Sequence, residues 1–335
     1  MSDAPSTLEV GSSRAQADAA AFRVDATDYR WGHVFAHAHG RGDWRILTTE
    51  VRQAEACLRL AAEEGPSPDR AAQRSIAVAF RRARRLHAAE DLEAWLAARD
   101  LTVVEWQRFV RGEALRRRHA AQLDTVVERS GVDDPAVRRS MAVWGWCSEA
   151  LPRWAGELAS RAAAAHAWCE RTDEPRPHPG DLGGLEELSD RFAAEVASAD
   201  RLEALLAARY LDWLRLDLDA AVFADPDTAA EARLCIRDDG WSLEEAARAG
   251  RARLQRHDVL VEAFDADLRH VLVRARDGDL LGPLPVAGQP TLLLVRRKDA
   301  PSLQDEQLRL IASRDLVRAA VAREVEDRVE WLHPR

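Results

Sequence analysis

The 335-residue sequence contains no stretch of 18 uncharged apolar residues, which excludes a membrane-spanning helix. Its first 20 residues show no basic start followed by an apolar run, so we expect no secretory signal. Its four cysteines, Cys57, Cys147, Cys169 and Cys235, are scattered and form no C-x-x-C pair. We therefore expect a cytoplasmic protein with reduced, buried thiols.

Catalytic and nucleotide-binding motifs are also missing. The sequence has no G-x-G-x-x-G, no G-x-x-x-x-G-K-[ST] and no G-x-S-x-G. No nucleophile and base are placed together, and Cys147, between Trp146 and Ser148, is expected to be buried rather than reactive. The sequence thus assigns no catalytic residue, no metal ligand and no cofactor.

Basic residues are fewer than acidic ones: the chain has 48 Lys and Arg against 57 Asp and Glu, which gives a formal charge of −9. This balance argues against nucleic acid as the main partner, because phosphate binding needs a concentrated basic surface. Basic clusters at 81–85 and 116–118 have acids nearby and lie in helical patterns, so we interpret them as solvated helix faces.

Apolar residues make up 47% of the chain, enough for two or three folded domains. The sequence has 11 Trp against 2 Tyr and 7 Phe. Tryptophan supplies large contact area at low entropic cost in cores and in peptide grooves alike. Among the tryptophans of the N-terminal half, we expect most of the following five in the core: Trp95, Trp106, Trp144, Trp146 and Trp154.

Helical periodicity dominates the chain up to about residue 215. Residues 1–25 are small and polar and predict a flexible tail, and residues 171–184, rich in Pro, Gly and charge, predict a linker. A capping box at Thr102 and Glu105 opens one helix, and Pro135 suits the first turn of another. Helical patterns cover 48–62, 70–85, 88–99, 102–130, 135–146, 152–169, 185–197 and 199–214.

The pattern changes at about residue 216. Strands are predicted over 216–223 and 291–296, with short extended pieces at 252–254, 259–261 and 284–286. Helices are predicted over 228–238, from the capping box Ser242–Glu245, over 268–276 and over 302–325, before a short tail at 329–332. The fold class is α+β, predominantly helical.

This order of elements resembles the parvulin-type prolyl isomerase domain. Segments 228–232 (TAAEA) and 239–247 (DGWSLEEAA) resemble the family's A-x-x-A…G-x-x-F-x-x-x-A segment, and 275–283 (ARDGDLLGP) is similar to its L-x-x-G-E-x-S-x-P-V element. The following strand is similar to its G-Y-H-I-I-K-V strand. The resemblance covers about 110 residues, and the order and spacing of its motifs carry it.

The flanking segments resemble chaperones of the SurA and PrsA type. Residues 92–110 are similar to their N-terminal helices, and 305–325 with Trp331 to their terminal helix and tail. The resemblance implies a SurA-like helical module (26–170) joined by connecting helices (185–215) to a parvulin-like domain (216–300). Residues 301–335 would then pack back on the module. Parvulin-related proteins encoded with peptide natural-product pathways are cytoplasmic and match this layout better than secreted foldases do.

Both histidines of active parvulins are missing. The first strand reads 219–224 (DAAVFA) where the family has R-x-H-I-L, and the last strand begins 288–292 (GQPTL). The resemblance therefore implies a non-catalytic binder of a precursor peptide or biosynthetic partner enzyme, with neither nucleic acid nor membrane as partner. With an aromatic groove near the terminal helix, the expected peptide contacts are Trp95, Trp106, Trp144, Phe223, Trp241 and Leu292.

Two alternatives remain open. The first is an active isomerase with a rearranged site that uses His257 or His270, although His270 lies in a predicted helix. The second is a metal site at 33–39 (HVFAHAH) with Asp43, because His33 and His37 would share one helix face. A strand at 33–39 is an equally good interpretation of that segment.

Overall fold

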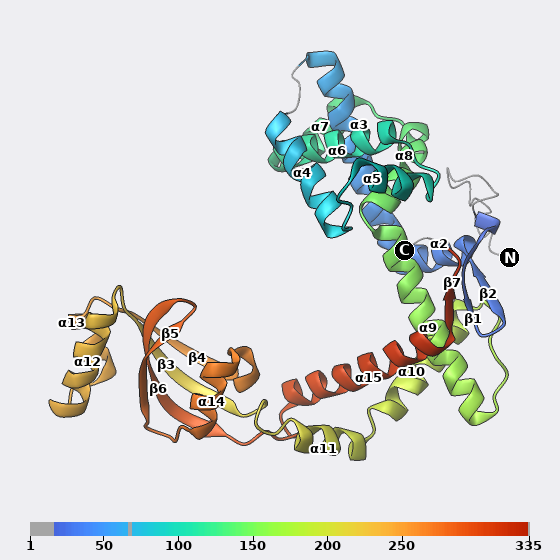
Figure 1. Cartoon of the computed structure of the whole chain (residues 1–335). Coiled ribbons are helices and arrows are strands. Elements are labelled where there is room, and N and C mark those ends of the chain that lie inside the picture. Colours follow the sequence, from blue (N-terminus) through green and yellow to red (C-terminus); the bar gives the residue numbers. More distant parts are fainter. Residues whose placement is uncertain (1–16, 66–68, 334–335) are drawn as a thin grey trace. The chain divides into compact units, whose positions relative to one another are not determined.

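The computed structural model describes residues 17–65 and 69–333 and confirms the predominantly helical α+β class (Figure 1). The chain forms two compact units, one of residues 1–193 with 320–335 and the other of residues 194–319. We call them the helical unit and the sheet unit. The boundaries between them pass through helices α10 (Leu182–Val196) and α15 (Glu306–Arg328).

The helical unit contains the helices from α2 to α10 and the end of α15. The capping box predicted at Thr102 is present, since its hydroxyl accepts from the Glu105 amide at 3.2 Å and the Glu105 carboxylate accepts from the Thr102 amide at 2.8 Å. Its helices are α2 (Trp31–Gly40), α3 (Asp43–Glu64), α4 (Arg70–Ala83), α5 (Ala89–Ala97), α6 (Val103–Arg118), α7 (Leu123–Ser130), α8 (Asp134–Cys147), α9 (Ala150–Thr172), α10 (Leu182–Val196) and the end of α15 (Glu306–Arg328).

A small antiparallel sheet joins the two ends of the described chain within this unit. Its order is β2 (Thr27–Arg30), β1 (Ala20–Val24), β7 (Val329–Trp331), with Phe22 opposite Trp331. Residues 320–333 therefore belong to the same unit as the N-terminal helices. Figure 1 shows α9 running between this sheet and the bundle of α3 to α8.

Ala20–Val24 corrects the predicted flexible tail of 1–25, whose first 16 residues lie outside the described chain. Three side chains of this strand, Ala21, Phe22 and Val24, are fully buried. A five-residue strand is stable only when it pairs with other strands, and one of its two partners here, β7, lies about 300 residues away in the sequence. Local patterning could not reveal it.

Alanine-rich α9 forms the centre of the helical unit's core. Trp154 and the run 162–165 are fully buried, because small side chains allow neighbouring elements to approach closely. The linker expected at 171–184 is shorter, since α9 extends to Thr172 and α10 begins at Leu182. Leu185 of α10 is buried in this same core.

The sheet unit is built on one antiparallel sheet of order β4-β3-β6-β5. One face is covered by α14 and contains Leu216, Leu218 and Leu293. The other face is covered by α12 and α13 and contains Phe223 and Leu292. The elements are α11 (Ala199–Ala208), β3 (Arg215–Val222), α12 (Pro226–Asp238), α13 (Leu243–Ala249), β4 (Arg253–Leu260), α14 (Ala266–Arg274), β5 (Leu280–Val286), β6 (Gln289–Asp299) and the first part of α15.

The order of elements in the sheet unit is the predicted one, with differences in the extent of single elements. The two short pieces expected at 252–254 and 259–261 form the single strand β4. The helix expected over 199–214 ends at Ala208, and in the helical unit the helix expected over 102–130 breaks at 119–122. Within the described residues, every helix is too short or too polar to cross a bilayer.

Candidate functional site

Two adjoining cavities open in the helical unit, with volumes of about 470 and 670 Å³. Arg84, Glu149 and Arg153 line both of them. We call the smaller one the aromatic cavity and the larger one the arginine cavity. Both volumes lie within the range of small-ligand and peptide side-chain pockets.

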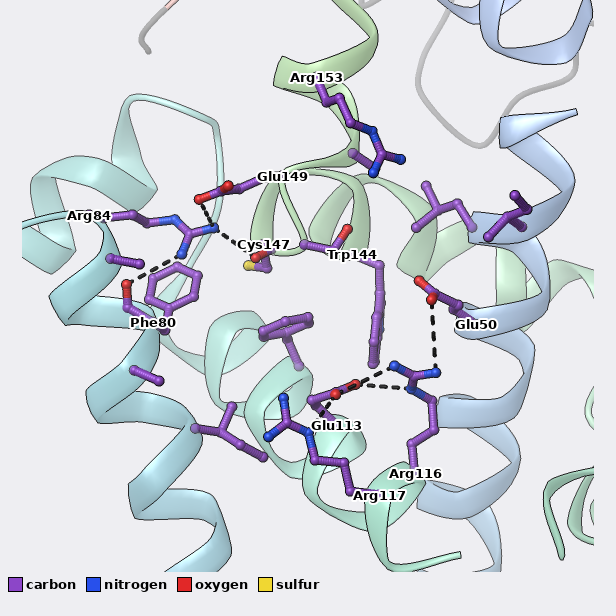
Figure 2. A pocket seen from close by; sticks show the side chains of 18 of the residues that line it. Glu50, Phe80, Arg84, Glu113, Arg116, Arg117, Trp144, Cys147, Glu149 and Arg153 are labelled. Carbon is purple, nitrogen blue, oxygen red and sulfur yellow. Dashed lines mark hydrogen bonds and ion pairs between the residues drawn. The ribbon is translucent and has the colours of Figure 1, made fainter. Parts of the chain in front are cut away.

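The aromatic cavity is lined by the rings of Phe80, Phe109 and Trp144 (Figure 2). Phe109 and Trp144 meet edge to face, with ring centroids 4.8 Å apart. Gly112 on α6 makes this contact possible, because a Cβ there would lie 3.0 Å from the Trp144 ring. The apolar surface is therefore set by close packing of α6 against α8.

Paired charges surround those rings. Buried Glu113 accepts hydrogen bonds from Arg116 at 3.0 Å and from Arg117 at 2.8 Å. On the opposite side, Arg84 lies 3.0 Å from Glu149. Figure 2 shows the Glu113 group and the Arg84–Glu149 pair on either side of the aromatic cavity. Four arginines and four acids line this cavity, so its formal charge is balanced.

Trp95 and Arg99 form one wall of the arginine cavity. Trp95 lies near the end of α5, and Arg99 lies four residues later, in the turn that follows the helix. The Arg99 guanidinium carbon lies 4.0 Å from the Trp95 ring centroid and 5.3 Å from that of Trp146, and Arg99 Nη1 donates to the Trp95 carbonyl at 2.9 Å. Stacking of this kind stabilises the arrangement by about 1 kcal/mol.

Arg84 stands between the two cavities. It donates to the Cys147 carbonyl at 2.9 Å and to the Phe80 carbonyl at 3.3 Å. Its guanidinium carbon lies 3.9 Å from the Phe80 ring centroid and 5.3 Å from that of Trp95. Arg84 thus links the end of α4 to the turn between α8 and α9.

That turn contains Glu149 in the left-handed region, with φ of 65°. A non-glycine residue there is uncommon and is retained only where its surroundings fix it. The Glu149 amide bonds to the Trp146 carbonyl at 3.2 Å, and its carboxylate pairs with Arg84. The sharp turn places Trp144, Trp146 and Arg153 around one pair of cavities.

Burial weakens the preference of these arginines for their charged form. It lowers the pKa of Arg99 to about 10, and the positive charge of Arg84 contributes to that fall. Burial also lowers the pKa of Arg84, although Glu149 opposes the effect. Two desolvated cations at such proximity favour a bound anion.

Cys147 is not a nucleophile in this setting. Its side chain is 3% exposed, and burial raises the pKa of its thiol to about 12. A neutral, inaccessible thiol contributes packing rather than chemistry. The predicted burial is confirmed.

Three of the predicted peptide contacts lie around Phe80. Its ring centroid is 5.3 Å from that of Trp95 and 5.8 Å from that of Trp106, while Trp144 reaches the group through Phe109. Trp95 faces the arginine cavity and Trp144 the aromatic cavity, while Trp106 lines a separate hollow of about 510 Å³. The structure therefore brings these three residues into one aromatic cluster, but Trp106 (9% exposed) and Trp144 (2% exposed) belong to the core of the helical unit, and Trp95 is the half-buried member.

The other three predicted contacts lie in the sheet unit and do not form a surface together. Phe223 is 2% exposed and Leu292 is fully buried, both beneath α12 and α13. As peptide contacts they are corrected to core residues, since their alternation on a two-sided sheet turns them inward. Trp241 is 41% exposed, between α12 and α13.

The sheet unit, all of it described, contains only two histidines, His257 and His270, and both are exposed. On the central strand Asp219 is 5% exposed and accepts a hydrogen bond from Arg296 at 2.5 Å. The neighbouring positions Ala220 and Ala221 are buried. An ion pair and small side chains thus occupy this part of β3, which contains no histidine.

The histidine-rich segment 33–39 is helical, which rules out the strand interpretation. His33 accepts a hydrogen bond from the Arg30 amide at 3.2 Å, and His39 stacks on Trp44 at 5.0 Å. His37 is buried. Among the described residues, no three His, Cys, Asp or Glu side chains gather as metal ligands.

Sequence reasoning missed Arg84, Arg99 and Arg153. The cluster at 81–85 is not simply a solvated face, because the Arg84 side chain is only 11% exposed. No local signal distinguishes Arg84 from its neighbours. The spacing of Trp95 and Arg99 was the one available hint, since it predicts a stacked pair on a helix.

Comparisons with known proteins give a limited result. No model of a known protein family matches the chain, and no curated protein does either. Among solved structures, one match comes from work on the virulence factor PEB4 and the periplasmic protein Cj1289, two structurally related SurA-like chaperones of Campylobacter jejuni. Identity is 13%, the match covers 67% of this chain and 89% of that chain, and the TM-score is 0.19.

Proposed function

We propose that this protein is a non-catalytic, chaperone-like binder of peptide segments and that its helical unit holds the peptide. One observation carries the proposal: the aromatic and arginine cavities adjoin, and both are lined by aromatic rings together with arginine hydrogen-bond donors that are held in place. Aromatic and arginine side chains dominate binding energy at protein interfaces. The sheet unit supplies no comparable pairing of accessible aromatic residues and donors at the positions predicted for it.

We further propose that it acts in the cytoplasm on a precursor peptide or a partner enzyme during maturation of a ribosomally synthesised peptide natural product. The resemblance to parvulin-related proteins of such pathways motivates this assignment. The four cysteines support it, because all are free thiols and three are buried, as is usual in a reducing compartment.

Titration of the full chain with candidate precursor peptides tests the proposal. We expect saturable binding that weakens when Trp95→Ala removes a cavity wall. Absence of saturable binding to any precursor peptide or pathway protein would contradict it.

A protease-coupled assay with a proline peptide separates binding from catalysis. We expect no acceleration of proline isomerisation, since His257 and His270 are exposed and the strand positions hold Asp219 and alanines. Acceleration that is lost with His257→Ala or His270→Ala would instead establish the isomerase alternative.

A further inference from the structure

The arginine cavity has a charge imbalance opposite to that of the whole chain. Among the described residues that line it, four are arginines and one, Glu149, is acidic. The chain has a formal charge of −9. The excess of positive charge is therefore a local feature of this cavity, and it is desolvated because two of the arginines are largely buried.

We propose that the arginine cavity binds a carboxylate of a peptide, with a neighbouring apolar side chain of that peptide against Trp95 and Trp146. This inference rests on the proposed function and narrows its ligand to acidic peptide segments. The carboxylate can come from an Asp or Glu side chain or from a peptide C-terminus, because both present the same two oxygens.

Arg99 is prepared for this role. Its guanidinium is held by the rings of Trp95 and Trp146 and by its bond to the Trp95 carbonyl. A planar guanidinium fixed in this way binds a carboxylate with little further loss of side-chain entropy. The lowered pKa of Arg99 agrees, since a bound carboxylate would offset the cost of burying its charge.

Arg153 and Glu149 give the cavity two exposed groups of opposite sign. Arg153 lines both cavities, and Figure 2 shows it directed from α9 into the aromatic cavity. Its guanidinium forms no hydrogen bond or ion pair with the described residues. Glu149 pairs with Arg84 at 3.0 Å and so competes with an incoming carboxylate. Neutralising these two residues should therefore change affinity in opposite directions.

The test is calorimetric titration of the full chain with three unlabelled heptapeptides. Two are acetylated and amidated, with central sequences Leu-Glu-Leu and Leu-Gln-Leu, and the third is Leu-Gln-Leu with a free C-terminal carboxylate. We expect one or both carboxylate peptides to bind about tenfold or more tightly than the neutral one, since charge-assisted hydrogen bonds have that strength. Whichever carboxylate peptide binds tightly identifies the source.

Variants test the site itself. Arg153→Gln should reduce the preference for the carboxylate peptide by about tenfold, and Glu149→Gln should increase it several-fold. Arg82→Gln, an equal charge change at an exposed position on α4 outside the cavity, should leave the preference unchanged. Arg99→Lys keeps the charge but removes the stacked fork, and its thermal unfolding shows whether the variant is folded.

Each outcome decides the inference. Equal binding of all three peptides, unaffected by Arg153→Gln, would overturn it while leaving peptide binding intact. Failure of all three peptides to bind would overturn it as well, and only failure of every precursor peptide and pathway protein would also overturn the proposed function. Tighter binding of an oligothymidylate than of any peptide would assign the cavity to nucleic acid instead.

Discussion

The two units of the chain differ in where they place their reactive side chains. On the central strand β3 of the sheet unit, Asp219 pairs with Arg296 and the neighbouring Ala220 and Ala221 are buried, and the strand contains no histidine. The helical unit instead lines two adjoining cavities with aromatic rings and arginines. Side chains suited to ligand binding therefore gather in the helical unit, and the role of a unit has to be argued from its side chains rather than from its fold.

Phe223→Ala should have the largest effect on stability, and that effect should be confined to the sheet unit. It removes a ring that packs beneath α12 and α13, and truncating a buried phenylalanine costs about 3–5 kcal/mol of stability. Hydrogen exchange should show loss of protection in β3 and β6. Peptide affinity of the helical unit should remain, and its loss below the unfolding temperature would show that the sheet unit takes part in binding.

Trp331→Ala should destabilise the helical unit by about 2 kcal/mol. Its ring lies 5.7 Å from that of Phe22 and packs on the core while β7 pairs with β1. Chemical denaturation followed by exchange in β1 and α9 measures the change. Leu332→Ala, which truncates an exposed neighbour, is the matched control, and an equal loss in both variants would contradict the packing role.

Acidification should destabilise the helical unit. Burial lowers the pKa values of His33, His37 and His166 below the ordinary value of 6.5. The unfolded chain then binds more protons, so stability is complete above about pH 6.5 and falls as pH decreases through and below it. Because three histidines act together, the stability lost on acidification should exceed the stability lost on removing one helix cap.

His166→Gln tests that pH dependence. His166 is fully buried, with Nδ1 3.2 Å from Asp25 and Nε2 3.2 Å from the Tyr29 hydroxyl, and the cations Arg176 and Arg328 also lower its pKa. The variant should reduce the difference between melting temperatures at pH 7.5 and pH 5. An unchanged difference would assign the acid sensitivity to other groups.

The two capping boxes provide the smallest comparison. Thr102→Ala should cost the helical unit about 1 kcal/mol, and Ser242→Ala should cost the sheet unit a similar amount, because each removes a hydroxyl that accepts a bond from the third helical amide. Unit-resolved hydrogen exchange measures both. A loss of protection in the unit that does not carry the substitution would show that the two units unfold together.

Local signals in the sequence predicted local structure well. Both capping boxes are present, and Asp133 and Pro135 open α8 as expected, with the Asp133 carboxylate accepting from the Ala136 amide at 2.8 Å. Periodicity failed at 119–122, where the helix breaks without Gly or Pro to mark the position. These successes and failures concern contacts within a few residues.

Long-range features were not predictable from the same patterns. Strand β1 was missed because one of its partners, β7, lies at the far end of the sequence. Trp95 and Trp144 were identified by residue type, but the arginine cavity was not. It depends on Arg84, Arg99 and Arg153 from separate segments meeting at the turn through Glu149.

Hydrogen exchange with and without a bound peptide tests most directly that the helical unit holds the peptide. A peptide that binds the full chain should increase protection in residues 84–99 and 146–153, around the arginine cavity. Residues 215–223 and 289–299 of the central strands should be unchanged. Protection confined to those strands, with none around Arg99, would contradict the account.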